Sequence, residues 1–92
     1  MSQSMLDTYE GDLKALGDDA VVVAPCSGKL NLDPAFIRPG AVVYRGEVVG
    51  RIIQRRGCQT VVSRFTGIVE RTLVEPGSKV RASQPVIWLR KI

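Results

Sequence analysis

The chain has 92 residues, with 13 Lys and Arg against 9 Asp and Glu, no His and two Cys. This length allows one small domain and excludes a multidomain enzyme with its own substrate domain. Without His, and with only two widely separated Cys, the sequence predicts no metal site and no catalytic nucleophile–base pair of the usual kind. No apolar run approaches the ~20 residues of a membrane span and no signal peptide is visible, so a cytoplasmic location without a membrane is expected.

The first twenty residues differ in charge from the rest of the chain. Residues 1–20 carry a net charge of −4, whereas residues 21–92 carry +8. Four apolar residues, Leu6, Tyr9, Leu13 and Leu16, recur at helical spacing in this acidic segment. The pattern predicts an acidic N-terminal arm or short helix over residues 1–20. Such an arm is either a tail in solution or a helix that docks on a partner or on the domain itself.

Residues 21–92 are predicted to form a domain built only from strands. Short runs rich in β-branched residues alternate with Gly, Pro and polar turns, which is typical of a β-sandwich or barrel. The runs in chain order are VVVAP, GKLNL, AVVY, EVVGRII, TVVSRF, GIVERTLV and PVIWLRKI.

The body contains an internal repeat. Residues 22–30 match residues 61–69 at an offset of 39, and residues 38–43 match residues 75–80 at an offset of 37. Each copy carries one Gly between its first two strands, which we expect to adopt a backbone angle that a Cβ would oppose, and one Pro-Gly turn in which Gly takes a positive φ. The repeated glycines are Gly28 and Gly67, and the turns are Pro39-Gly40 and Pro76-Gly77. Two copies that pair face to face would close one core.

A polar segment lies between the two copies. Gln54–Gln59 is flanked by apolar pairs on both sides, so it predicts a β-hairpin whose tip projects from the body.

The repeated pattern, with its Ala-Pro-x-Ser-Gly opening, its Pro-Gly turns and its central hairpin, resembles the biotinyl/lipoyl domain family over residues 21–92. The resemblance implies that family's fold, a flattened barrel-sandwich hybrid of two four-stranded sheets with quasi-two-fold symmetry. The family includes biotin carboxyl carrier domains, lipoyl domains and modules of membrane adaptor proteins. No export signal or long helical hairpin accompanies this chain, which disfavours the adaptor reading.

Carrier members of this family place a Lys at the tip of the central hairpin. Counting back from Gly67, that position falls at Arg56, and no Lys occurs between Lys29 and Lys79. A guanidinium stays protonated and offers no neutral amine for an amide bond to biotin or lipoate. We therefore expect no cofactor. Lys29 and Lys79 are expected at other turns of the barrel, away from the attachment position.

The hairpin contains an alternative functional group. Arg55, Arg56 and Cys58 lie close together, with Gly57 between them, and nearby positive charge favours the thiolate form of a cysteine. Cys58 is therefore a candidate carrier group or part of an active site that a partner completes. In the resembled fold the first strand runs toward the hairpin end, which would bring Cys26 near Cys58 as a redox pair. We favour the alternative of two ordinary cysteines, one of them partly buried, because reactivity also needs exposure and a suitable geometry.

Together, the resemblance and the missing Lys predict a non-enzymatic interaction or accessory subunit of a carboxylase-like or acyl-transferring complex. Arg55 and Arg56 would dock on an acidic or phosphate-bearing surface of a carboxylase-like or acyltransferase-like subunit. Nucleic acid is not expected as a partner, because stacking needs exposed aromatic residues and most of the five fall at strand positions expected to be core. These five are Tyr9, Phe36, Tyr44, Phe65 and Trp88.

Overall fold

The computed structural model describes residues 18–92, which form eight β-strands and one short 3-10 helix and contain no α-helix. The predicted arm over residues 1–20 therefore lies outside the described residues, except for its last three positions. The strands are β1 (Asp19–Val23), β2 (Gly28–Leu32), β3 (Val42–Val43), β4 (Val48–Gln54), β5 (Gly57–Val62), β6 (Gly67–Thr72), β7 (Lys79–Val80) and β8 (Pro85–Lys91). The 3-10 helix η1 (Pro34–Phe36) follows β2, and Asp33 caps it by accepting a hydrogen bond from the Ala35 N–H at 2.9 Å.

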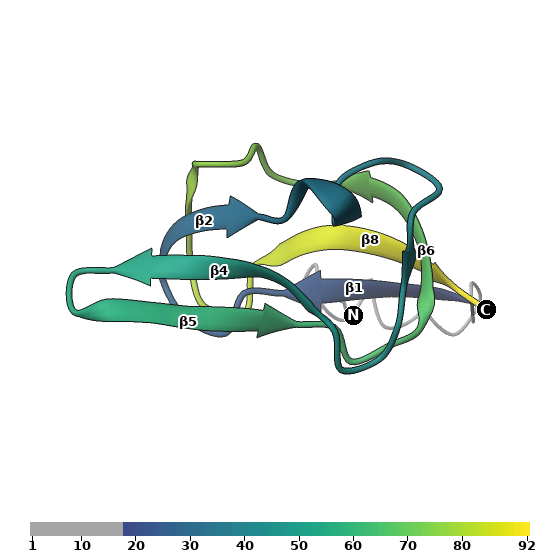
Figure 1. The fold of residues 1–92 in the computed structure, drawn as a ribbon, viewed down its shortest axis with the longest axis horizontal. Coiled ribbons are helices and arrows are strands. Elements are labelled where there is room, and N and C mark those ends of the chain that lie inside the picture. The colour runs from purple at the N-terminus through teal and green to yellow at the C-terminus, as the bar shows by residue number, and fades with distance from the viewer. Residues whose placement is uncertain (1–17) are drawn as a thin grey trace, which may run out of the picture.

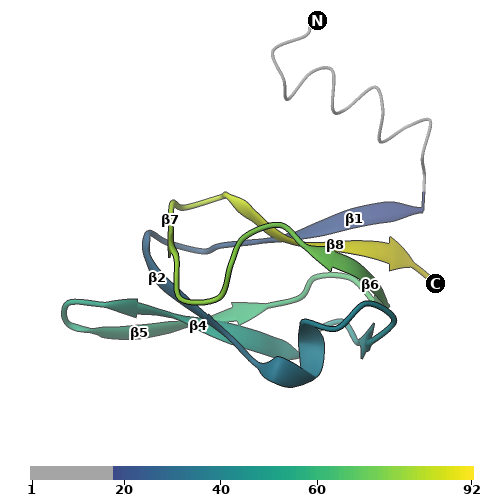
Figure 2. The same cartoon turned by 90° about the horizontal axis from the view of Figure 1, so that it is seen from above.

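The strands form two four-stranded antiparallel sheets, which confirms the predicted all-β architecture (Figure 1, Figure 2). The β1 sheet has the order β1-β8-β6-β3, and the β5 sheet has the order β5-β4-β2-β7. If β1 to β4 exchange places in order with β5 to β8, so that β1 becomes β5 and β8 becomes β4, the strand order of one sheet becomes that of the other. The repeat in the sequence is therefore a repeat in the topology, and each half of the chain contributes two strands to each sheet.

The core lies between the two sheets and is built from equivalent positions of the two copies. Its members are almost all β-branched or Leu side chains with less than 5% of their surface exposed. The equivalent buried pairs are Val22 and Val61, Leu30 and Val69, Val43 and Val80, Val49 and Val86, and Ile52 and Leu89. Because neither half buries these residues alone, the halves depend on each other for a core.

Gly28 and Gly67 are required by space. A Cβ on Gly28 would lie 2.6 Å from the Ile53 carbonyl oxygen, and a Cβ on Gly67 would lie 2.6 Å from the Arg90 carbonyl oxygen. Ile53 and Arg90 are themselves equivalent positions of the repeat. The prediction of an unusual backbone angle at Gly67 is wrong, since its φ is not positive. The close approach of a neighbouring strand excludes a side chain there instead.

The tight turns do follow the predicted backbone chemistry. Gly40 and Gly77, in the two Pro-Gly turns, have φ values of 91° and 88°. A second pair of equivalent turns precedes β4 and β8, where Gly46 has a φ of 90° and Ser83 a φ of 69°. Ser83 is the one non-glycine residue with positive φ among residues 18–92. It therefore stores backbone strain that its counterpart Gly46 avoids.

Candidate functional site

The β4–β5 hairpin extends beyond the other strands at one end of the molecule (Figure 1, Figure 2). Its strands pair up to Gln54 and Gly57, so the turn itself contains only Arg55 and Arg56. The predicted hairpin over Gln54–Gln59 is thus present, with a shorter turn. Gly57 has a φ of 139°, and a Cβ there would meet nothing within 4 Å, so the backbone angle alone favours glycine at this position.

The two tip arginines are exposed and form no ion pair with any acidic residue of the described range 18–92. Within residues 18–92, the only ion pair joins Arg90 and Glu70, at 3.3 Å, on the opposite sheet. A side-chain amide ties the tip end of β4 to the segment before β2, because Gln54 Nε2 donates a hydrogen bond to the Ser27 carbonyl oxygen at 3.0 Å. The arginines are therefore held on an anchored hairpin while their guanidinium groups remain available to a partner.

Four residues form one row across the outer face of the β5 sheet. Cys58 pairs with Ile53, Ile53 pairs with Lys29, and Lys29 pairs with Lys79. Cross-strand partners point to the same side of a sheet, and all four side chains are exposed. The expectation that Lys29 and Lys79 lie at other turns is therefore wrong. The order β4-β2-β7 makes them direct neighbours and brings them to the hairpin.

The row and the tip line one broad depression with a volume of about 780 Å³. Four cationic residues line it, Lys29, Arg55, Arg56 and Lys79, and none of the acidic residues that the structure describes does. The remaining lining residues, Cys58 among them, are neutral. The arrangement suits recognition of an anionic surface, because the positive charges share one face and are not neutralised within it.

The two cysteines are free thiols in different surroundings. Cys58 is exposed on β5 within the depression, whereas Cys26 is partly buried and packs against the core. Cys26 does not line the depression, so the structure does not bring the two thiols together there. Over residues 18–92, no group of three or more His, Cys, Asp or Glu side chains could hold a metal ion.

The aromatic residues are not where the sequence placed them. None of Phe36, Tyr44, Phe65 and Trp88 is fully buried, so the expectation that most belong to the core is wrong; Tyr9 lies outside the described residues. Small Val, Ile and Leu side chains fill the narrow space between the sheets instead.

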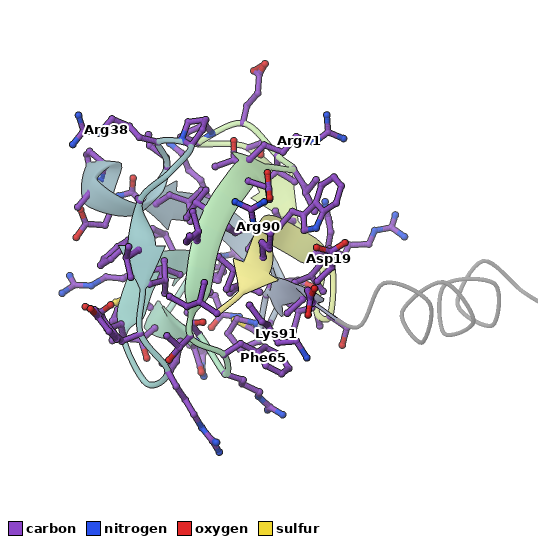
Figure 3. The ribbon with its side chains drawn as sticks, turned by 90° about the vertical axis from the view of Figure 1, so that its right-hand side faces the viewer. Asp19, Arg38, Phe65, Arg71, Arg90 and Lys91 are labelled. Atoms are coloured by element: carbon purple, nitrogen blue, oxygen red, sulfur yellow. The ribbon has the colours of Figure 1, made fainter. Side chains whose placement is uncertain are left out.

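The chain's own cations lie over two of these aromatic rings. The Arg71 guanidinium lies 5.7 Å from the centre of the Trp88 ring. The Lys91 ammonium lies 5.5 Å from the centre of the Phe65 ring, and Figure 3 shows both residues at the end of the molecule opposite the hairpin tip. None of the four described aromatic residues lines the basic depression, so these rings are not placed there for nucleic-acid bases to stack on.

Comparisons with known proteins establish the fold. No family model matches the sequence. No curated protein matches it either. Among solved structures, the chain is similar to a single-chain, multi-domain long-chain acyl-CoA carboxylase, with a TM-score of 0.69, 16% identity and 96% of this chain covered. The chain spans about a tenth of that protein's length, since 10% of the carboxylase chain is covered. In residues 18–92, no helix is long and apolar enough to cross a membrane.

Proposed function

We propose that this chain is a biotinyl/lipoyl-like accessory subunit that carries no biotin or lipoate and docks, without catalysis of its own, on a carboxylase-like or acyl-transferring complex. The observation that carries the proposal is the pair of arginines at the hairpin turn, where carrier domains of the resembled family hold their acceptor Lys. The likeness to part of a multi-domain acyl-CoA carboxylase supports a carboxylase context.

The chemistry of the tip favours docking over attachment. Attachment requires a neutral amine, and a guanidinium group offers none. Arginine instead forms two parallel hydrogen bonds with a carboxylate or phosphate, which gives a directed contact with an anionic surface. Lys29 and Lys79 are amines, but they lie on β2 and β7 rather than at a turn.

The absence of attachment is tested by intact mass. The full chain is co-expressed with a biotin ligase and, separately, with a lipoyl ligase, and a known carrier domain in the same cells reports that each ligase is active. The expected mass is that of the unmodified polypeptide. A mass gain that matches either cofactor, mapped to any Lys, would overturn the proposal.

The docking role is tested by affinity purification from the native host. The tagged full chain should recover a carboxylase-like or acyltransferase-like subunit. Arg55→Gln combined with Arg56→Gln should weaken that binding about tenfold or more, since desolvated charge-assisted contacts are the stronger hydrogen bonds. Arg38→Gln with Arg45→Gln is the matched control, because it removes the same charge from exposed positions outside the depression. Equal binding by the wild type and the tip variant would refute docking through the tip.

A second candidate function rests on Cys58. Its thiol is exposed within the basic depression, where an acyl or other group on sulfur would face the same partner. In this alternative the chain is an unconventional carrier or completes the partner's active site. Cys58→Ser should then abolish activity of the complex and leave binding intact, whereas docking alone predicts that activity survives this substitution.

A further inference from the structure

The two sheets can be compared residue by residue, because exchanging the halves of the chain superimposes their strand orders. The row Cys58–Ile53–Lys29–Lys79 of the β5 sheet corresponds to a row of the β1 sheet. That row is Asp19, Arg90, Ile68 and Val42, joined by the same cross-strand pairings. The two rows occupy equivalent positions in one fold but differ in charge.

The row of the β1 sheet balances its charge, and the row of the β5 sheet does not. Asp19 and Arg90 both lie at the end of the molecule that Figure 3 shows. Arg90 is opposite Asp19 in the register of β8 and β1, and it forms the ion pair with Glu70. Its neighbours in the row, Ile68 and Val42, are apolar. At the positions equivalent to that apolar pair, the β5 sheet holds Lys29 and Lys79.

This lysine pair costs stability. Like charges directly opposite each other in an antiparallel pair repel, and neither ammonium has an ion-pair partner in residues 18–92. The Ile68–Val42 pair shows that the same fold accepts two apolar side chains there. Folding therefore does not require the lysines, and a bound anion would remove their repulsion.

The spacing of the cations fits an extended chain. The step from β4 through β2 to β7 spans about 10 Å, because neighbouring strands lie about 4.8 Å apart, and the tip lies about 7 Å further along β4. The cationic positions thus run diagonally over about 12 Å. Acidic residues at alternate positions of an extended peptide lie about 7 Å apart, so three of them cover this distance.

We propose that the outer face of the β5 sheet, from the lysine pair to the tip arginines, binds an extended acidic segment of the partner protein. This inference rests on the proposed docking function and names what the partner presents. Ile53, 42% exposed between Lys29 and Cys58, provides an apolar contact for such a peptide. A nucleic-acid strand fits less well, because no aromatic side chain among residues 18–92 lines the face.

The test measures fluorescence anisotropy of a labelled eight-residue peptide in which Glu and Thr alternate, titrated with the full chain at low salt. Lys29→Gln combined with Lys79→Gln should lower the affinity about fivefold or more. The Arg38→Gln and Arg45→Gln control carries the same net charge and should change it less than about twofold. Equal losses in both double variants would show general charge attraction and overturn the proposal, as would unchanged binding in the lysine variant.

Two further measurements separate other occupants. An eight-residue oligothymidylate should bind more weakly than the peptide, and tighter binding that depends on Lys29 and Lys79 would assign the face to nucleic acid. Neutralising Asp7, Glu10 and Asp12 in the full chain should leave the peptide affinity unchanged. A tenfold increase would show that the chain's own acidic segment occupies the face. These titrations use a synthetic peptide and no partner protein. A negative result would therefore overturn the acidic-segment proposal, and the affinity purification would still test the proposed docking function separately.

Discussion

Lys79→Glu should make the protein more stable and a weaker binder at the same time. In the wild type, Lys79 and Lys29 lie opposite each other on β7 and β2, and neither forms an ion pair with an acidic residue in the range 18–92. The substitution replaces the repulsion between the two side chains with an attraction. It leaves the backbone pairing of β2 and β7 unchanged, because the side chain at position 79 is exposed. It also places a negative charge in the face that we propose for an acidic segment.

The size of the effect follows from the register. Directly opposite residues have Cα atoms about 4.5–5.5 Å apart, so the charged ends of two exposed side chains lie about 6 Å apart. Coulomb's law in water gives about 0.7 kcal/mol at that distance, and salt at 0.15 M reduces it by about half. Reversing the sign counts this energy twice, so the gain is about 0.7 kcal/mol at 0.15 M salt and about 1.4 kcal/mol at very low salt.

The assay is urea unfolding followed by circular dichroism at low and at high salt. With a slope of about 1 kcal/mol per molar urea, the midpoint should rise by roughly 1.4 M at very low salt and by little at high salt. Lys79→Gln is the control and should give about half of the rise. A midpoint that falls, or a rise that does not depend on salt, would refute the claim that the lysine pair is repulsive.

Three other predictions concern the fold. Gly67→Ala should destabilise the protein by about 1–3 kcal/mol in urea unfolding, because the new Cβ meets the Arg90 carbonyl oxygen at 2.6 Å; full stability would contradict this close approach. Ser83→Gly should raise the melting temperature by about 4 °C, because glycine adopts this positive φ without strain. Gly46→Ala should lower it by a similar amount, and the cause would be the positive φ alone, because the new Cβ would meet nothing within 4 Å. Changes of the opposite sign would count against backbone strain at these two positions. Deletion of residues 1–17 should leave one cooperative thermal transition, since β1 begins at Asp19, and its loss would place that segment in the core.

The fold could be predicted well from the sequence because the internal repeat shows the same succession of strands and turns twice. Equivalent positions such as Val22 and Val61 are buried in both halves, so the same spacing of apolar residues and turn residues occurs twice. The positive φ of Gly40 and Gly77 was predictable from the Pro-Gly pairs alone. The reason for Gly67 was not, since the approach of the Arg90 carbonyl depends on how two strands of one sheet pack.

The candidate site could be predicted only in part. The tip arginines were visible because a hairpin turn is a local feature of the sequence. Lys29 and Lys79 are far apart along the chain, and only the pairing of β2 with β7 makes them neighbours. The repeat in the sequence is the signal that was missed. It makes Lys29 and Lys79 the counterparts of Ile68 and Val42, so pairing between Ile68 and Val42 implies pairing between the two lysines. The aromatic residues were misplaced because three of the four described ones lie outside the strands, Phe36 in η1, Tyr44 after β3 and Phe65 after β5. A run of apolar residues in the sequence does not show where its strand ends.

The pairing of β1 with β8 has a consequence for how the chain could be connected. Asp19 pairs with Arg90, so the start of β1 and the end of β8 lie side by side at one end of the molecule. The corresponding strands of the repeat, β5 and β4, are joined by the Arg55–Arg56 turn at the other end. The tip is therefore the one place where the chain joins its two halves covalently. In a circular permutant, a new link would connect the end of β8 to the start of β1, and the chain would be cut at the Arg55–Arg56 turn. Its strands would make the same pairings in a different chain order. Its barrel would be intact and its tip open, which separates what the turn contributes to the fold from what it contributes to recognition.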